Sequence, residues 1–204
     1  MLISELAKMV HENAVEHGWW DDDREPPKII ALIHSEWSEA LEEARAGRPL
    51  VWYFCNDCAD GSCNAAPDNV AYACGFDKAG RKPEGVAVEL IDGCIRILDY
   101  LGHLGTVFKD KDDTETVFES LYSDSNMNKV PNNVTHVIAL LHLYTSTAFM
   151  SQNNALIPIN VFGLVEALAA ALSWVKKQGL APLAILLEKH AYNKTRPYKH
   201  GKKF

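Results

Sequence analysis

The sequence lacks any apolar stretch that is long and uninterrupted enough to cross a bilayer. Its longest apolar runs are broken by polar, charged or glycine residues, namely His136, His142, Gly163 and Glu166. The first ten residues place Glu5 and Lys8 where a signal peptide needs an apolar core, so they predict an amphipathic helix. We therefore expect a cytoplasmic protein with no membrane partner.

An excess of positive charge is also missing, since the formal net charge is −7. Nonspecific nucleic-acid binding needs a basic face, so no nucleic-acid partner is expected. The C-terminus is the exception in this acidic chain. Its last eleven positions contain the basic residues Lys194, Arg196, Lys199, Lys202 and Lys203.

The sequence lacks several motifs that are typical of other enzyme classes. The sequence contains no G-x-x-x-x-G-K-[ST] loop, no H-E-x-x-H and no G-x-S-x-G. What it does contain is 204 residues of ordinary globular composition, 48% of them hydrophobic. That length suffices for one domain with a sizeable core.

Apolar residues at helical spacing predict an all-α fold. Glycine and proline set the ends of the expected helices, and asparagine caps two of them. The expected helices are residues 2–17, 27–46, 86–101, 134–150, 161–178 and 183–192. We interpret the chain 1–204 as one helical bundle. Its parts include an irregular Cys-containing loop at 48–85, a connector with an additional helical hairpin at 106–180, and a last helix with a basic tail at 181–204.

Two acidic pairs stand three residues apart on expected helices: Glu36 with Glu39, and Glu89 with Asp92. That spacing puts both members of a pair on one helical face. If the helices pack together, four carboxylates share a small volume, which requires a cation. Oxygen ligands of this kind suit Mg²⁺, with Mn²⁺ as an alternative. The competing interpretation is a solvated face, which runs rich in glutamate usually form.

The loop at 48–85 contains four of the five cysteines, Cys55, Cys58, Cys63 and Cys74. In a reducing compartment such a set can hold a structural Zn²⁺ in place of disulfides. Cys55 and Cys58 have the spacing of a zinc half-site, whereas Cys63 and Cys74 do not. Incidental free thiols are the alternative.

One segment of the sequence echoes another. IALIHSEWSEA at residues 30–40 and IALLHLYTSTA at residues 138–148 match at six of eleven positions. In the second copy Tyr144 and Thr147 replace Glu36 and Glu39. The echo predicts a pseudo-dimeric bundle with one acidic site, and chance similarity between amphipathic helices is the alternative.

The acidic pairs, together with the ending EKHAYNKTRPYKHGKK at residues 188–203, resemble the MazG-like all-α nucleoside triphosphate pyrophosphohydrolases. Members of that superfamily have an E-x-x-E helix, an E-x-x-D helix and often a K-x-x-N-x-x-R-P-x-x-H-G-K-like tail. The resemblance implies Mg²⁺-dependent cleavage of a nucleoside triphosphate between its α and β phosphates. It also implies a homo-oligomer, a dimer or larger.

By motif position, the resemblance makes Glu36, Glu39, Glu89 and Asp92 the Mg²⁺ ligands. The same comparison assigns contacts with the nucleotide to residues of the tail, namely Lys189, Asn193, Arg196, Tyr198, Lys199 and His200. Two departures affect substrate choice and oligomeric state. Residues 40–88 make an unusually long gap between the acidic pairs, and residues 102–182 separate the second pair from the last helix.

Two other functions remain open on the sequence. The acids could hold a metal and a nucleotide without turnover, or the cysteine loop could be the working part of a zinc-stapled interaction module. A carboxylate not bound to metal, such as Glu39 or Glu43, is expected to serve as general base in an enzyme.

Overall fold

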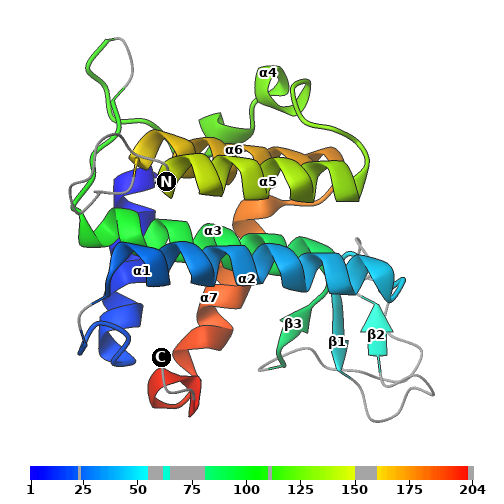
Figure 1. The fold of residues 1–204 in the computed structure, drawn as a ribbon, viewed down its shortest axis with the longest axis horizontal. Coiled ribbons are helices and arrows are strands. Elements are labelled where there is room, and N and C mark those ends of the chain that lie inside the picture. Colours follow the sequence, from blue (N-terminus) through cyan, green and yellow to red (C-terminus); the bar gives the residue numbers. More distant parts are fainter. Residues whose placement is uncertain (23, 55–61, 65–80, 110–111, 150–159, 202–204) are drawn as a thin grey trace.

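A computed structural model describes residues 1–22, 24–54, 62–64, 81–109, 112–149 and 160–201. The fold is mostly helical, with one small sheet (Figure 1). In chain order the elements are α1 (Ile3–Glu16), α2 (Pro26–Arg45), β1 (Trp52–Phe54), β2 (Ser62–Asn64), β3 (Pro83–Glu84), α3 (Val86–His103), the 3₁₀ helix η1 (Phe118–Tyr122), α4 (Asp124–Met127), α5 (Val134–Phe149), α6 (Val161–Lys177), α7 (Pro182–Lys194) and the 3₁₀ helix η2 (Tyr198–Gly201).

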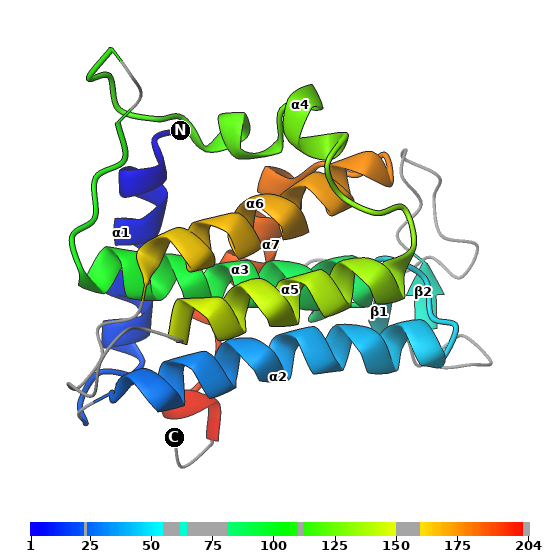
Figure 2. The same cartoon turned by 45° about the horizontal axis from the view of Figure 1, so that its top comes forward.

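Four long helices, α2, α3, α5 and α6, form a bundle around one apolar core (Figure 2). The helices α2 and α3 make one antiparallel hairpin, and α5 and α6 make another, which packs against the first. The helices α1 and α7 both cross α3 on the side away from α5 (Figure 1). Because α3 contacts α1, α2, α6 and α7, it is the central element of the bundle.

The six helices expected from apolar periodicity are confirmed, with ends that differ by at most a few residues. The expected caps are also present: Asn133 Oδ1 accepts the backbone N–H of Thr135, and Asn160 Oδ1 accepts that of Phe162. Among the described residues, no helix combines the length and apolar character needed to cross a membrane.

The segment 48–85 differs from the expectation of an irregular loop. Its described residues include the strands β1, β2 and β3, which form an antiparallel sheet in the order β2-β1-β3. The strands are two or three residues long, too short for an alternating pattern to show in the sequence. The short helix α4, within a stretch expected to be a plain connector, was likewise missed.

The internal echo has a structural counterpart in the contact between α2 and α5. His34 Nδ1 lies 2.7 Å from His142 Nδ1, and Trp37 Nε1 donates a hydrogen bond of 2.9 Å to Thr145 Oγ1. Both contacts join positions that the alignment of the two segments makes equivalent. In antiparallel helices, self-equivalent pairs meet at a local two-fold axis, so this geometry favours the repeat interpretation over chance.

Candidate metal centre

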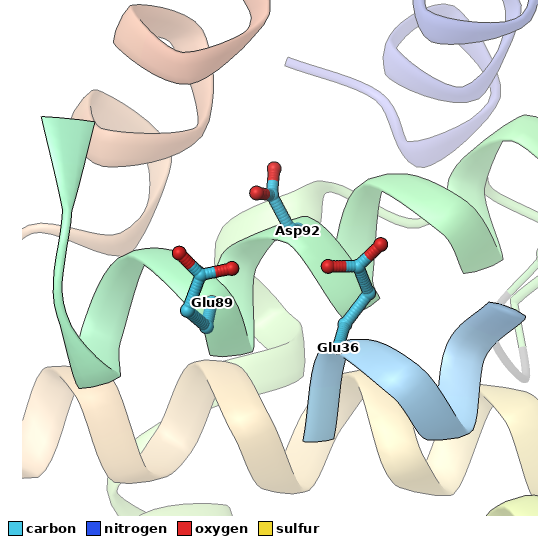
Figure 3. A group of neighbouring side chains, drawn as sticks. All are labelled: Glu36, Glu89 and Asp92. Atoms are coloured by element: carbon cyan, nitrogen blue, oxygen red, sulfur yellow. The ribbon is translucent and has the colours of Figure 1, made fainter. Parts of the chain in front are cut away.

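Three of the four predicted metal ligands meet in one place. Glu36 from α2 and Glu89 and Asp92 from α3 each offer a carboxylate oxygen, and these atoms lie within 4.8 Å of one another. Figure 3 shows the three carboxyl groups converging in the angle between the two helices. Glu36 and Glu89 are buried, with exposed fractions of 6% and 4%. The packing of α2 on α3 therefore turns two separate sequence motifs into one acidic cluster.

The fourth predicted ligand, Glu39, is exposed and stands outside this group. It nevertheless lines the same cavity, which has a volume of about 120 Å³ and runs along α3 beneath α1 and α7. Glu39 lies one helical turn beyond Glu36 on α2, so its exposed side chain is part of the cavity wall. This position suits a carboxylate that contacts water or substrate.

Two cations, the half-buried Arg96 and the buried Lys189, balance the acids. Arg96 Nε donates to Glu36 Oε1 at 3.0 Å, and Lys189 Nζ lies 2.8 Å from Asp92 Oδ2. Lys189 also donates to the backbone oxygen of Pro83 at 3.1 Å and is 1% exposed. Lys189 is thus placed as a structural counter-ion to the cluster, supplied by α7.

Burial disfavours the ionised form of the carboxyl groups in the cluster. It raises the pKa of Glu89 to about 9, although Lys189 pulls in the other direction. Burial also raises the pKa of Glu36, with Arg96 opposing the shift. For Lys189, burial alone would lower the pKa, but the carboxylates of Asp92 and Glu89 outweigh it and raise the pKa. The cluster therefore accepts additional positive charge, either as a proton on Glu89 or as a metal ion that replaces the proton.

The donor set fits a hard divalent cation. Three carboxylates on rigid helices offer oxygen ligands only, and the adjoining cavity leaves room for water and substrate oxygens to complete the shell. Mg²⁺ and Mn²⁺ bind in this manner in proteins. Glu36, Glu89 and Asp92 are thus the residues that could hold the ion.

The tail residues divide into two groups. Asn193 and Arg196 line the cavity, as expected for a contact with substrate. Tyr198 and Lys199 instead hold the tail to the loop after α1: Tyr198 Oη donates to Asp21 Oδ2 at 2.6 Å, and Lys199 Nζ donates to Asp22 Oδ2 at 2.5 Å. Neither is among the described residues that line the cavity, so their role with the nucleotide stays a prediction. The side chain of His200 lies outside the described part.

Several residues of the cavity were not singled out by the motifs. Asn13 on α1 and Trp19 in the following loop line its wall. Arg24 and Arg96 both place their guanidinium groups over the Trp19 ring, at 5.3 and 5.4 Å from its centroid. The acidic-pair motif could not indicate these residues, because only the crossing of α1 over α3 brings them to the acids.

Asp99, two turns beyond Asp92 on α3, organises the loop that carries these tryptophans. Its Oδ1 accepts hydrogen bonds from Trp20 Nε1 at 2.8 Å and lies 2.8 Å from His11 Nδ1. Its Oδ2 accepts from Arg24 Nη1 at 3.1 Å. With its oxygens occupied in this way, Asp99 fixes the wall of the cavity and is unsuited to bind metal.

The proposed zinc ligands fall largely outside the described residues. Cys55, Cys58 and Cys74 lie in segments that are not described, and Cys63 belongs to β2 without a described side chain. The fifth cysteine, Cys94, is fully buried on α3, and burial raises the pKa of its thiol. It is a core residue, as the apolar pattern predicted.

Comparisons of the chain with protein-family models, with curated proteins and with solved structures gave no match. The case for a function therefore depends on the geometry of the acidic cluster and its cavity.

Proposed function

We propose that the protein is a Mg²⁺-dependent nucleoside triphosphate pyrophosphohydrolase with a MazG-like helical fold. It would cleave a ribo- or deoxyribonucleoside triphosphate between the α and β phosphates, giving the nucleoside monophosphate and pyrophosphate. The observation that carries the proposal is the convergence of Glu36, Glu89 and Asp92 on one cavity. Three carboxyl groups at such distances face only two neighbouring cations, Arg96 and Lys189, so the arrangement is explained best by a bound metal ion that also contacts phosphate.

The cavity offers positive charge for the polyphosphate on two sides. Arg196 from the segment after α7 and Lys82 beside β3 line it, and Arg96 lies against the acids. Guanidinium groups bind phosphate oxygens bidentately, and lysine acts as a point charge. Cations beside a carboxylate cluster fit a ligand that carries both phosphate and Mg²⁺. A site that binds a metal ion alone would not need these cations.

In this proposal Glu36, Glu89 and Asp92 would hold Mg²⁺, which would neutralise phosphate charge and acidify a bound water. Glu39 is the better candidate for the general base that takes the water's proton. It lines the cavity, whereas Glu43 accepts a hydrogen bond from Trp52 Nε1 at 2.7 Å and stands away from the cavity. Arg196 and Lys82 would keep the leaving pyrophosphate in place.

The proposal is tested by measuring pyrophosphate release from the common ribo- and deoxyribonucleoside triphosphates with Mg²⁺. We expect release from at least one nucleotide and its loss, by about 10²-fold or more, in a Glu36→Gln/Asp92→Asn double variant. Glu42→Gln is the matched control, because Glu42 is exposed and pairs only with Arg45 in this part of α2. It should leave the rate unchanged.

A folded protein that releases no pyrophosphate from any nucleotide would overturn the enzymatic proposal. The alternative, a nucleotide- and metal-binding module without turnover, would then be supported if calorimetry still showed Mg²⁺-dependent nucleotide binding. Zinc analysis of the purified protein, with Cys55→Ser and Cys58→Ser variants, tests the third alternative, the zinc-stapled module. Loss of zinc without any change in folding would remove the stapling role.

A further inference from the structure

Two asparagine side chains in the cavity have buried oxygens that lack partners. Asn13 Oδ1 on α1 and Asn193 Oδ1 on α7 are shielded from solvent, and neither accepts a hydrogen bond from any described residue. Both residues line the same cavity as the acidic cluster, and Asn193 is 9% exposed overall. Folded proteins rarely leave buried acceptors unpaired, because desolvation without a new hydrogen bond is unfavourable. Two such acceptors in one cavity indicate a ligand that completes them.

The chemistry of an acceptor restricts the part of the ligand it can contact. Phosphate oxygens at neutral pH are acceptors themselves, so they suit Arg196 and Lys82 and are repelled by the oxygens of Asn13 and Asn193. Donors are found on the nucleoside part of a nucleotide, as base N–H groups and sugar O–H groups. The lining thus contains both cations that suit phosphate and acceptors that suit the nucleoside.

The wall near Asn13 suits a nucleoside for a second reason. Trp19, six residues further along the chain, lines the cavity and is 6% exposed. Its ring is fixed between neighbours, with the Arg24 and Arg96 guanidinium groups within 5.3 and 5.4 Å of the centroid. An immobilised indole beside unpaired acceptors provides an apolar surface next to hydrogen-bonding groups, as base recognition requires.

We propose that Asn13 and Asn193 are specificity-determining residues that accept hydrogen bonds from donors on the substrate's nucleoside. Such donors are the N–H groups of the base, exocyclic or in the ring, and the hydroxyls of the sugar, and the donor that Asn13 and Asn193 contact sets the preference. This inference rests on the proposed function, because it assumes that the acidic cluster and the cations take the phosphates. Asn13 is the informative member of the pair, since no sequence motif indicated it.

The experiment compares nucleotides that differ by one donor. kcat/KM is measured for the common nucleoside triphosphates, for analogues that lack one base donor (hydrogen in place of an exocyclic amino group, or methyl in place of a ring N–H hydrogen), and for the 2′-deoxy forms of each. A site built around a hydrogen bond discriminates strongly against a substrate that lacks it. We expect Asn13→Ala to lower kcat/KM for the preferred donor-bearing nucleotide by about 10- to 100-fold. For the analogue that lacks the donor, the same substitution should change kcat/KM by less than about 3-fold, so that the variant no longer prefers the donor-bearing nucleotide.

The preference that Asn13→Ala abolishes shows whether the donor belongs to the base or to the sugar. A lost preference for a base N–H group assigns the acceptors to the base, and a lost preference for the 2′-hydroxyl assigns them to the sugar. Equal losses for all nucleotides, or an unchanged preference in both Asn13→Ala and Asn193→Ala, would overturn the inference. Asn128→Ala, at an exposed position, is the matched control and should change nothing.

Two further measurements distinguish a change in nucleotide specificity from a loss of folding and from a failure of the proposed function. Alanine is favourable in a helix, so α1 should persist in Asn13→Ala, and circular dichroism checks this. Asn13→Ser, which keeps a shorter acceptor, is the second variant should Asn13→Ala not fold. If the wild-type protein hydrolyses no nucleotide, the proposed function fails by itself. The same ratios are then measured as dissociation constants by calorimetry, and ratios that are equal in wild type and variant overturn the inference.

Discussion

At the scale of the residue, the candidate site is a group of carboxyls whose charge is opposed by burial. Glu89 and Glu36 are nearly inaccessible to solvent, and both have raised pKa values for that reason. Asp92 is less buried and is paired with Lys189. The raised pKa of Glu89 links folding, pH and metal binding.

Glu89 gives the metal-free protein a specific pH dependence. Its pKa rises from 4.5 to about 9 on folding, so between these values the native state holds a proton that the unfolded chain has released. Stability must then fall as pH rises through this window. We expect the free energy of unfolding in urea, with chelator present, to be lower at about pH 8.5 than at about pH 6.

The matched variant for this prediction is Glu89→Gln, which is permanently neutral and similar in shape. Its unfolding free energy should depend less on pH, and it should gain less stability from Mg²⁺ than the wild type does. For the wild type, stabilisation by Mg²⁺ should grow with pH, because the ion replaces the proton. A pH dependence that is the same in both proteins would contradict the assignment.

Lys189 contributes charge balance from within the core. In Lys189→Met the carboxylate of Asp92 would lose its partner in a buried setting, where removing one member of an ion pair costs about 3–5 kcal/mol. Urea unfolding without Mg²⁺ should show this loss, and saturating Mg²⁺ should recover part of it. Lys8→Met is the control, since Lys8 and Glu12 form an exposed pair worth about 0.5 kcal/mol or less. A variant as stable as the control would contradict the role.

At the scale of the element, close approach of α2 and α3 brings the acids together. Gly93 lies one residue after Asp92 and faces the fully buried ring of Trp37, which follows Glu36 directly. A Cβ atom at position 93 would lie 2.1 Å from Trp37 Cζ3. The absence of a side chain at Gly93 thus lets the indole fit between the helices beside the metal ligands.

Substitution of Gly93 tests this packing. Alanine is the better helix former by about 1 kcal/mol, yet overpacking in a core costs about 1–3 kcal/mol, so Gly93→Ala should destabilise the protein. Thermal and urea unfolding measure the change. Trp37→Leu combined with Gly93→Ala should be less destabilising than the two single changes added together, because the clash is removed. Strict additivity would show that the ring moves aside freely.

At the scale of the whole molecule, two helical hairpins pack against each other, and the acidic cluster found among the described residues lies on the first. The self-equivalent pairs His34–His142 and Trp37–Thr145 lie at the centre of their contact. In the repeat interpretation, the second hairpin would take the place of a second copy of the first hairpin in a symmetric dimer. The three clustered carboxyls, which are the candidate metal ligands, all come from α2 and α3.

A site built within one chain predicts no complementation between subunits. Glu36→Gln protein and Asp92→Asn protein, unfolded together and refolded as a mixture, should show no more pyrophosphate release than either variant alone. Recovery of activity in the mixture would show that chains exchange α2 or α3. Light scattering on the same samples reports the oligomeric state, and an obligate tetramer would count against the pseudo-dimer.

The sequence by itself determined the helices, because apolar periodicity, caps and chain breakers act locally and leave a mark every few residues. It also indicated the acidic ligands, since three-residue spacing fixes which side chains share a helical face. The pattern could not separate Glu39 from the other three acids, because exposure depends on what covers the helix. The strands of the segment 48–85 are too short to produce an alternating apolar pattern in the sequence.

The tertiary structure decided how distant helices meet, which no local pattern encodes. Only the crossing of α1 and α7 over α3 brings Asn13, Asn193 and Lys189 to the acids of α2 and α3. The same packing places Tyr198 and Lys199 against the loop after α1, although the tail motif grouped them with the cavity residues. Burial and its effect on the pKa of Glu89 follow from these long-range contacts, because desolvation depends on every element packed around the side chain.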